Sequence, residues 1–191
     1  LVFPTHVSLW LAIGCSLLLT GAFHEDGLAD TADGLGGGLT RDKKLLIMKD
    51  SRIGTYGATA LIIALTGKYL LLVENEQLIL SLIIAYALSR TVAASLLFDM
   101  QYVTDADTSK SKPLANNQSI TDLLILIVTA TPIFILLPLT QAVMICGALI
   151  VYRQLVKCYF NQQIGGYTGD CLGAAQQIGE LLIYLLLLIQ L

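Results

Sequence analysis

The chain alternates between long runs of apolar residues and shorter polar stretches. Six apolar segments can be marked, at residues 2–22, 58–73, 78–98, 123–139, 142–158 and 178–191. A helix needs about 20 apolar residues to cross a bilayer, so the second and last segments are short unless neighbouring residues extend them. Helix is the local structure that satisfies its own backbone hydrogen bonds in lipid. The pattern predicts an all-α, polytopic transmembrane helical bundle of about six membrane segments, with short interfacial helices in the loops.

Composition supports a membrane protein. The 191 residues are 55% hydrophobic and 13% charged, with a mean hydropathy of +0.74, whereas a soluble domain of this size carries far more charge on its surface. Pro132 and Pro138 fall in the fourth segment and are expected to kink or end its helix. A thiolate metal site or a structural disulfide is not expected, because the four cysteines lack CxxC or CxH spacing: Cys15, Cys146, Cys158 and Cys171.

The polar loops differ in length and in charge. Those at 23–57, 99–122 and 159–177 are long, whereas those at 74–77 and around Thr140 are very short. Basic residues mark the cytoplasmic side of membrane proteins, so the long loops are predicted to be cytoplasmic. All eleven basic residues except Lys68 and Arg90 lie in or beside these loops: Arg41, Lys43, Lys44, Lys49, Arg52, Lys110, Lys112, Arg153 and Lys157.

The residues able to do chemistry gather in the same long loops. A transporter needs access from both sides of the membrane, whereas an enzyme acting on cytosolic substrates needs only one. We expect residues 1–191 to form a single integral membrane domain. Because the chain begins at Leu1 rather than Met, we also expect an N-terminal portion to be missing, and no signal peptide is indicated.

The densest polar signal is an acidic block at residues 24–34, HEDGLADTADG. Asp26, Asp30 and Asp33 follow the spacing i, i+4, i+7, which places three carboxylates on one face of a helix. Such charges repel one another, and near a membrane a divalent cation would offset the repulsion. Oxygen ligands suit Mg²⁺ or Mn²⁺ rather than zinc. The plainer interpretation is a solvated acidic turn, but the nearby glycines also indicate close approach of a ligand to the backbone.

A basic block follows at residues 48–57, MKDSRIGTYG. Lys49 and Arg52 are three positions apart and can share a face. Arginine binds phosphate as a two-pronged fork and lysine as a point charge. Ordinary membrane-anchoring charge explains either residue alone, whereas an acidic metal-binding block nearby favours phosphate binding.

A glycine-rich block occupies residues 165–174, GGYTGDCLGA. It precedes the last apolar segment and places Asp170 near a helix start, where negative charge is favoured. Helix capping explains Asp170 by itself. The surrounding glycines exceed what a cap requires, and their backbone N–H groups could form an anion-binding nest.

Two aspartate-bearing blocks and a basic block on one membrane face suit Mg²⁺-assisted phosphoryl transfer. The sequence holds no GxxxxGK[ST] or GxGxxG motif. Ser/His/Asp catalysis is unsupported, since the only histidines are His6 and His24. His24 suits either a proton shuttle or a structural role.

Three blocks together, at 24–34, 48–57 and 166–174, resemble the signature blocks of the cobalamin synthase family, or adenosylcobinamide-GDP ribazoletransferases. They occur in the family's order, and the resemblance spans nearly the whole chain. It implies that a ribose hydroxyl of α-ribazole or its phosphate attacks adenosylcobinamide-GDP, giving adenosylcobalamin or its phosphate and releasing GMP. It also implies Mg²⁺ as cofactor and the bacterial inner membrane as location. Family members usually carry more membrane sequence before the acidic block.

The resemblance also implies roles for individual positions. Asp26, Asp30 and Asp33 would hold metal and diphosphate, with Asp170 as a further ligand or a group that orients the hydroxyl. Beyond its two substrates we expect the lipid bilayer as a partner and no nucleic acid, and self-association is left open. The predicted substrate-binding residues are His24, Lys49, Asp50, Arg52, Gly54, Gly57, Gly166 and Gly169.

Three other functions fit these residues less well. A CDP-alcohol phosphotransferase has an Arg after the alanine of its acidic motif, where Asp30 follows Ala29 here. A cation transporter would place its carboxylates at mid-membrane depth in broken helices, whereas these follow a complete apolar segment. A non-catalytic scaffold has no reason to concentrate three carboxylates on one face. An enzyme is therefore the favoured interpretation.

Overall fold

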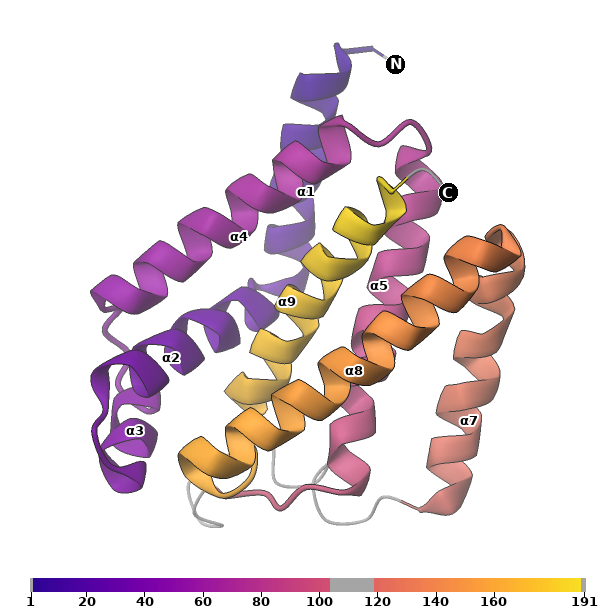
Figure 1. Cartoon of the computed structure of the whole chain (residues 1–191). Helices are drawn as coiled ribbons and strands as arrows, with labels where there is room; N and C mark the ends of the chain where they lie inside the picture. Colours follow the sequence, from indigo (N-terminus) through magenta and orange to yellow (C-terminus); the bar gives the residue numbers. More distant parts are fainter. Residues whose placement is uncertain (1, 104–118, 190–191) are drawn as a thin grey trace.

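The computed structural model describes residues 2–103 and 119–189, and within these ranges the chain is built from helices joined by short turns (Figure 1). The predictions for Lys110 and Lys112 lie outside the described residues. The elements are α1 (Thr5–Thr20), α2 (Phe23–Gly37), α3 (Arg41–Met48), α4 (Thr55–Val73), α5 (Leu78–Ser95), η1 (Leu96–Phe98), α7 (Ile120–Ala130), η2 (Thr131–Leu136), α8 (Leu139–Ile164) and α9 (Gly169–Leu187).

Four helices of the described part are long and apolar enough to cross a membrane: α4, α5 with η1, α8 and α9. Helices α1 and α2 are long and apolar enough only when they are taken together as one span, and that span is bent by 84°. The apolar stretch Ile120–Leu136 is shorter. The predicted all-α polytopic bundle is confirmed, while its count of about six segments is approximate.

The bend between α1 and α2 comes from two residues in the left-handed region. Gly21 has φ +63° and Ala22 has φ +53°. The N–H of Ala22 donates to the carbonyl of Leu17 at 2.8 Å and closes the end of α1. Left-handed backbone costs a non-glycine residue about 1–2 kcal/mol, so the surrounding packing must hold Ala22 there. The acidic block therefore forms its own helix, α2.

Prolines mark the break between α7 and α8, as predicted. Helix α7 ends at Ala130, η2 follows with Pro132 in its first turn, and Pro138 is the N-cap of α8. Proline is tolerated at a helix start but lacks the N–H that a helix interior needs.

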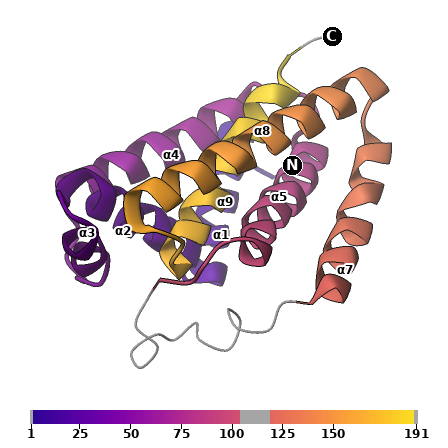
Figure 2. The same ribbon diagram turned by 60° about the horizontal axis from the view of Figure 1, so that its bottom comes forward.

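Helix α9 begins at Gly169, well before the predicted start of the last segment at residue 178. Its first half looks polar in sequence, yet Gln176 and Gln177 are buried there among neighbouring helices. Of its apolar window 56% is buried within the protein, against 17% for α8. Viewed from the loop end, α9 lies between α2 and α5 (Figure 2). Burial against protein rather than lipid thus explains why hydropathy underestimated its length.

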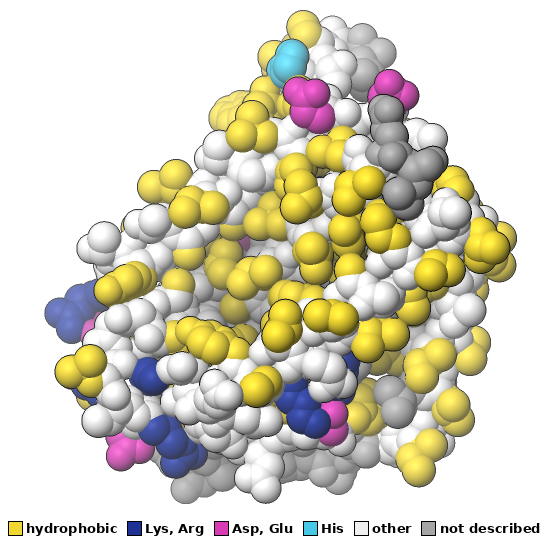
Figure 3. Space-filling model, viewed as in Figure 1, with side chains coloured by type: hydrophobic (Ala, Val, Ile, Leu, Met, Phe, Trp, Pro, Cys, Tyr) yellow, Lys and Arg dark blue, Asp and Glu magenta, His cyan; other side chains and the backbone are white. Residues whose placement is uncertain are grey.

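The predicted grouping of the loops agrees with the arrangement in space. Helix α3, the end of α5 and the turn between α8 and α9 lie at one end of the bundle, and the turn between α4 and α5 lies at the other (Figure 1). Lys and Arg side chains gather at the first end, below a broad apolar belt (Figure 3). We call this end the loop face.

Candidate active site

Helix α2 carries the acidic block and presents its three aspartates on one face, as their spacing predicted. Their surroundings differ along the helix. Asp26 is exposed and Asp30 is half-buried, whereas Asp33 is only 7% exposed. The carboxylates nearer the start of α2 are therefore accessible to a ligand, and the last one is enclosed by protein.

Asp33 is enclosed because it holds the start of α4. Its two oxygens accept the N–H groups of Gly54 at 2.7 Å and Gly57 at 2.8 Å. Gly54 is the N-cap of α4 and has no side chain with which to cap it, so Asp33 supplies that function from another helix. A β-carbon at Gly54 would lie 2.5 Å from an Asp33 oxygen, so glycine permits this approach.

Asp170 reaches α2 from the first turn of α9. Thr168 caps that helix, and its hydroxyl accepts the N–H of Cys171 at 3.2 Å. The two helices touch through glycines. A β-carbon at Gly27 would lie 2.9 Å from the carbonyl of Asp170, and one at Gly173 would lie 3.0 Å from a backbone oxygen of α2. This close crossing brings Asp170 beside the acidic face.

The carboxylates interact with one another. Asp30 experiences the charges of Asp26, Asp170 and Asp33, and Asp170 experiences that of Asp26. The salt bridges found within residues 2–103 and 119–189 involve Asp50, Asp99 and Glu180 instead. We define Asp26, Asp30 and Asp170 as the carboxylate cluster. Like charges that interact in this way favour the binding of a cation.

The chemistry of the cluster fits Mg²⁺ shared with a phosphate. In the described part of the chain, no three His, Cys, Asp or Glu side chains are arranged to hold an ion by themselves. Mg²⁺ rarely needs such a cage, since it is usually bound by one or two carboxylates, water and substrate phosphates. The accessible Asp26 and the half-buried Asp30 meet that requirement.

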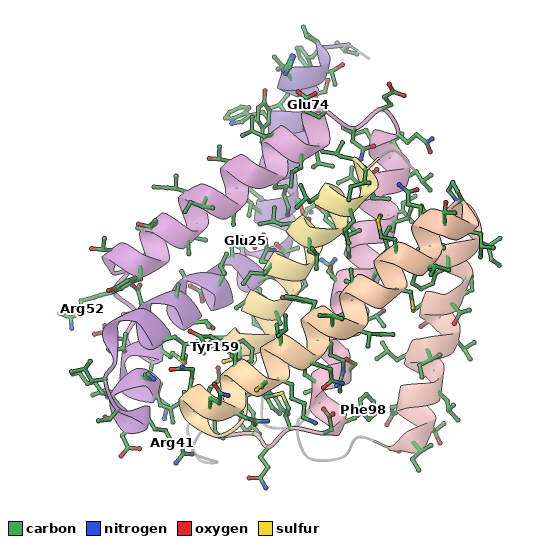
Figure 4. The ribbon with its side chains drawn as sticks, in the orientation of Figure 1. Glu25, Arg41, Arg52, Glu74, Phe98 and Tyr159 are labelled. Atoms are coloured by element: carbon green, nitrogen blue, oxygen red, sulfur yellow. The ribbon has the colours of Figure 1, made fainter. Side chains whose placement is uncertain are left out.

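The basic block is arranged differently from the prediction. Lys49 is the C-cap of α3 and Arg52 lies in the following turn, so the two residues do not share the face of one helix. Arg52 forms a forked pair with Asp50, with Nη2 2.6 Å from Oδ2, and holds the pKa of that carboxyl at about 2. Its side chain is 86% exposed and points outward (Figure 4). The structure does not bring Arg52 to the carboxylate cluster.

The glycine block is hydrogen-bonded to the segment that follows η1. The N–H of Tyr167 donates to the carbonyl of Gln101 at 2.9 Å, and the N–H of Val103 donates to the carbonyl of Tyr167 at 3.0 Å. Gly166 is packed so closely that a β-carbon would clash with the carbonyl of Gln101. Glycine at position 166 therefore has a packing role.

A pocket of about 240 Å³ lies at the start of α9, and its lining includes Gly169, the neighbour of Asp170, but none of the three cluster carboxylates. It contains His24 and Gly169, two of the predicted substrate-binding residues, and the loop residues Tyr102 and Tyr167. Residues of four helical elements complete it: Phe23 from α2; Arg90, Ala93 and Ala94 from α5; Leu97 from η1; Leu172, Gly173 and Gln176 from α9.

Sequence reasoning missed a buried polar network inside the bundle. Lys68 Nζ lies 2.8 Å from Glu180 Oε1, and both side chains are at most 6% exposed. Glu25 points from α2 towards α9 (Figure 4), where Gln177 donates to it at 2.9 Å. Charged residues within apolar segments were the available signal, because lipid makes them costly unless paired.

Fold and site together define a multi-pass membrane protein with a carboxylate cluster suited to phosphoryl-group chemistry. Comparison with known proteins identifies the family: the model for cobalamin-5-phosphate synthase matches residues 1–188, and the chain belongs to that family. The resemblance seen in the sequence is thereby confirmed.

Similar proteins named adenosylcobinamide-GDP ribazoletransferase occur in several bacteria. The one from Vibrio parahaemolyticus is 52% identical over 191 residues, which cover 98% of this chain and 72% of the relative. The one from Vibrio cholerae is 53% identical, covering 98% and 73%. The one from Shewanella piezotolerans is 53% identical over 188 residues, covering 96% and 73%. No solved structure matches the chain.

Proposed function

We propose that the chain joins adenosylcobinamide-GDP to α-ribazole or its phosphate, forming adenosylcobalamin or its phosphate and releasing GMP. The names of the relatives support the reaction. The observation that carries the proposal is the carboxylate cluster, assembled from α2 and α9 near the loop face.

The chemistry is a displacement at phosphorus. A ribose hydroxyl oxygen of the acceptor bonds to the phosphorus next to the cobinamide, the bond from that phosphorus to the oxygen of GMP breaks, and the hydroxyl proton leaves to a base. Asp26 and Asp30 would hold Mg²⁺ together with the diphosphate. When bound, the ion neutralises charge on the transferred and leaving groups. Asp170 faces this region from α9 and orients the attacking hydroxyl. Asp33 positions the start of α4 through its two backbone hydrogen bonds.

The loop face is assigned to the cytoplasm of a bacterium, with the apolar helices in its inner membrane. Described basic residues at this face include Arg41, Lys43 and Lys157, and cytoplasmic loops are enriched in such residues. Both substrates would then reach the cluster from one side of the membrane.

The test is transfer by the chain in proteoliposomes, supplied with adenosylcobinamide-GDP and α-ribazole. Formation of the cobalamin and GMP in equal amounts is expected with Mg²⁺, and its loss is expected with a chelator. Product formation that the chelator leaves unchanged would rule out the metal while keeping the reaction. Absence of both products with Mg²⁺ present, from a folded and inserted protein, would refute the proposed reaction.

A further inference from the structure

The pocket beside the carboxylate cluster has the size of a single ring system. Its volume of about 240 Å³ lies below the roughly 300–1,000 Å³ of pockets that enclose drug-sized ligands. A corrinoid is far too large for it. Most of its wall is apolar or aromatic, including Phe23, Ala94, Leu97 and Leu172. Tyr102 and Tyr167 add two rings that meet edge to face with centroids 5.4 Å apart.

The pocket adjoins the reacting region on both helices of the site. On α2, Phe23 precedes Asp26 by three positions and Asp30 by seven, so all three share one helical face. On α9, Gly169 lines the pocket and directly precedes Asp170. A flat group held in the pocket can therefore direct a substituent along α2 towards the carboxylates.

From this arrangement we infer that the pocket binds the fused aromatic base of the nucleoside acceptor and directs its ribose to the carboxylate cluster. The inference rests on the proposed function and adds a subsite to it. Flat, largely apolar rings are bound by apolar walls and by edge or face contact with aromatic side chains.

The polar groups of the pocket distinguish this base from guanine. Gln176 already donates to Ser89 at 3.1 Å and to Glu180 at 2.8 Å, and its oxygen accepts from Gln177. Arg90 offers only donors, one of which goes to the carbonyl of Tyr86 at 2.9 Å, so it cannot accept from the N–H groups of guanine. Guanine carries several donors and acceptors on its edge, and burying them without partners is costly. A benzimidazole nucleoside has one free ring nitrogen, an acceptor for which a single N–H of His24 suffices.

A pocket-filling substitution tests the assignment, and Ala94→Leu adds bulk to the pocket wall. We expect the KM for α-ribazole to rise about tenfold or more, since fit in an apolar pocket discriminates at this scale, with the KM for adenosylcobinamide-GDP unchanged. Ala87→Leu is the matched control, because Ala87 lies seven residues earlier on the same face of α5 and outside the pocket. It should change both values by no more than about twofold.

Three outcomes separate the alternatives. An unchanged KM for α-ribazole in Ala94→Leu would overturn the inference and leave the proposed function intact. A selective rise in the KM for the GDP-bearing substrate would overturn it in favour of a guanine pocket. Absence of transfer by the unmodified chain would instead refute the proposed function.

The unmodified protein supplies a second test that does not depend on the folding of a variant. The free base 5,6-dimethylbenzimidazole should inhibit transfer competitively against α-ribazole and not against adenosylcobinamide-GDP. The same pattern should appear when equilibrium binding of labelled α-ribazole to the protein is displaced by the free base. Competition against the GDP-bearing substrate alone, or no displacement of α-ribazole at saturating base, would overturn the inference.

Discussion

Helix α9 contains two charged regions that are built in opposite ways. At its start, Asp170 meets Asp26 and Asp30, and these carboxylates experience mainly one another's charge. Further along, Glu180 is 1% exposed and fully partnered. Its Oε1 receives Lys68 at 2.8 Å and the Tyr184 hydroxyl at 2.9 Å, while Oε2 receives Gln176 at 2.8 Å.

The difference distinguishes a ligand-binding site from a structural ion pair. We call the buried pair Lys68–Glu180 the lock. A buried charge whose partners are all protein groups gains nothing from a ligand, and it fixes the helices that supply those partners. A cluster of like charges leaves an electrostatic cost that a cation relieves on binding. One helix thus carries both the lock that holds it in the bundle and a carboxylate that faces the substrate. Substitutions in the two regions should separate activity from stability.

The largest effect is expected from Asp30→Asn. Removing a charge that holds the metal and diphosphate should lower turnover on the order of 10³-fold, comparable to the loss of a group that stabilises the transition state. The thermal midpoint should not fall, because one of several repelling charges disappears. Turnover and thermal unfolding are measured on the same preparation. Asp42→Asn, an exposed carboxylate in the first turn of α3, is the control, and normal turnover by Asp30→Asn would remove the cluster from the reaction.

Lys68→Met should act on the lock instead. It leaves Glu180 buried without its counter-charge, and the free energy of unfolding should fall by about 3–5 kcal/mol. The double variant Lys68→Met with Glu180→Gln should recover much of that loss, because both charges are then gone. Denaturant unfolding in detergent provides the measurement. Equal losses in the single and double variants would mean that packing, rather than charge, accounts for the effect.

Asp33→Asn tests whether Asp33 belongs with the reacting carboxylates or with the structural ones. An amide offers one acceptor oxygen, so the N–H of Gly54 or Gly57 loses its partner, at a cost of about 1–3 kcal/mol. Turnover of the folded protein should fall less than in Asp30→Asn. Unfolding and turnover are again compared. A loss of turnover as large as that of Asp30→Asn, with stability unchanged, would restore Asp33 as a metal ligand.

The smallest effect is expected from Arg52→Ala. The side chain is 86% exposed and paired with Asp50, so the thermal midpoint should stay the same. If Arg52 contacts phosphate in the bound complex, the KM for adenosylcobinamide-GDP should rise a few-fold. In Arg52→Lys this KM should rise less, because the positive charge is kept. Steady-state kinetics with the second substrate saturating measures this. An unchanged KM in both variants would limit the phosphate site to the cluster.

Local patterns in the sequence predicted what local geometry determines. Helical periodicity placed Asp26, Asp30 and Asp33 on one face, and Pro132 and Pro138 marked the break before α8. Charge distribution grouped the loops at one end. These features depend on neighbouring residues in the chain, so hydropathy, spacing and residue type carry them.

Contacts between distant segments could not be predicted in the same way. That both oxygens of Asp33 accept backbone N–H groups depends on how α4 packs against α2. The ion pair between Lys68 and Glu180 requires α4 and α9 to be neighbours. The sequence around either residue does not indicate which residue it pairs with. Several glycines that indicate close approach of a ligand in the sequence also permit contact between protein backbones, as Gly166 does against Gln101.

The crossing of α2 and α9 has a consequence for how the protein is made. Ribosomes synthesise α2 long before α9, and the helices between them are made in the interval. The backbone contact at Gly27 and Gly173 forms only when α9 arrives. Until then Asp26 and Asp30 lie on a nascent chain without Asp170. Completion of the cluster therefore waits for membrane insertion of α9, and a chain arrested before that step carries two of the three carboxylates.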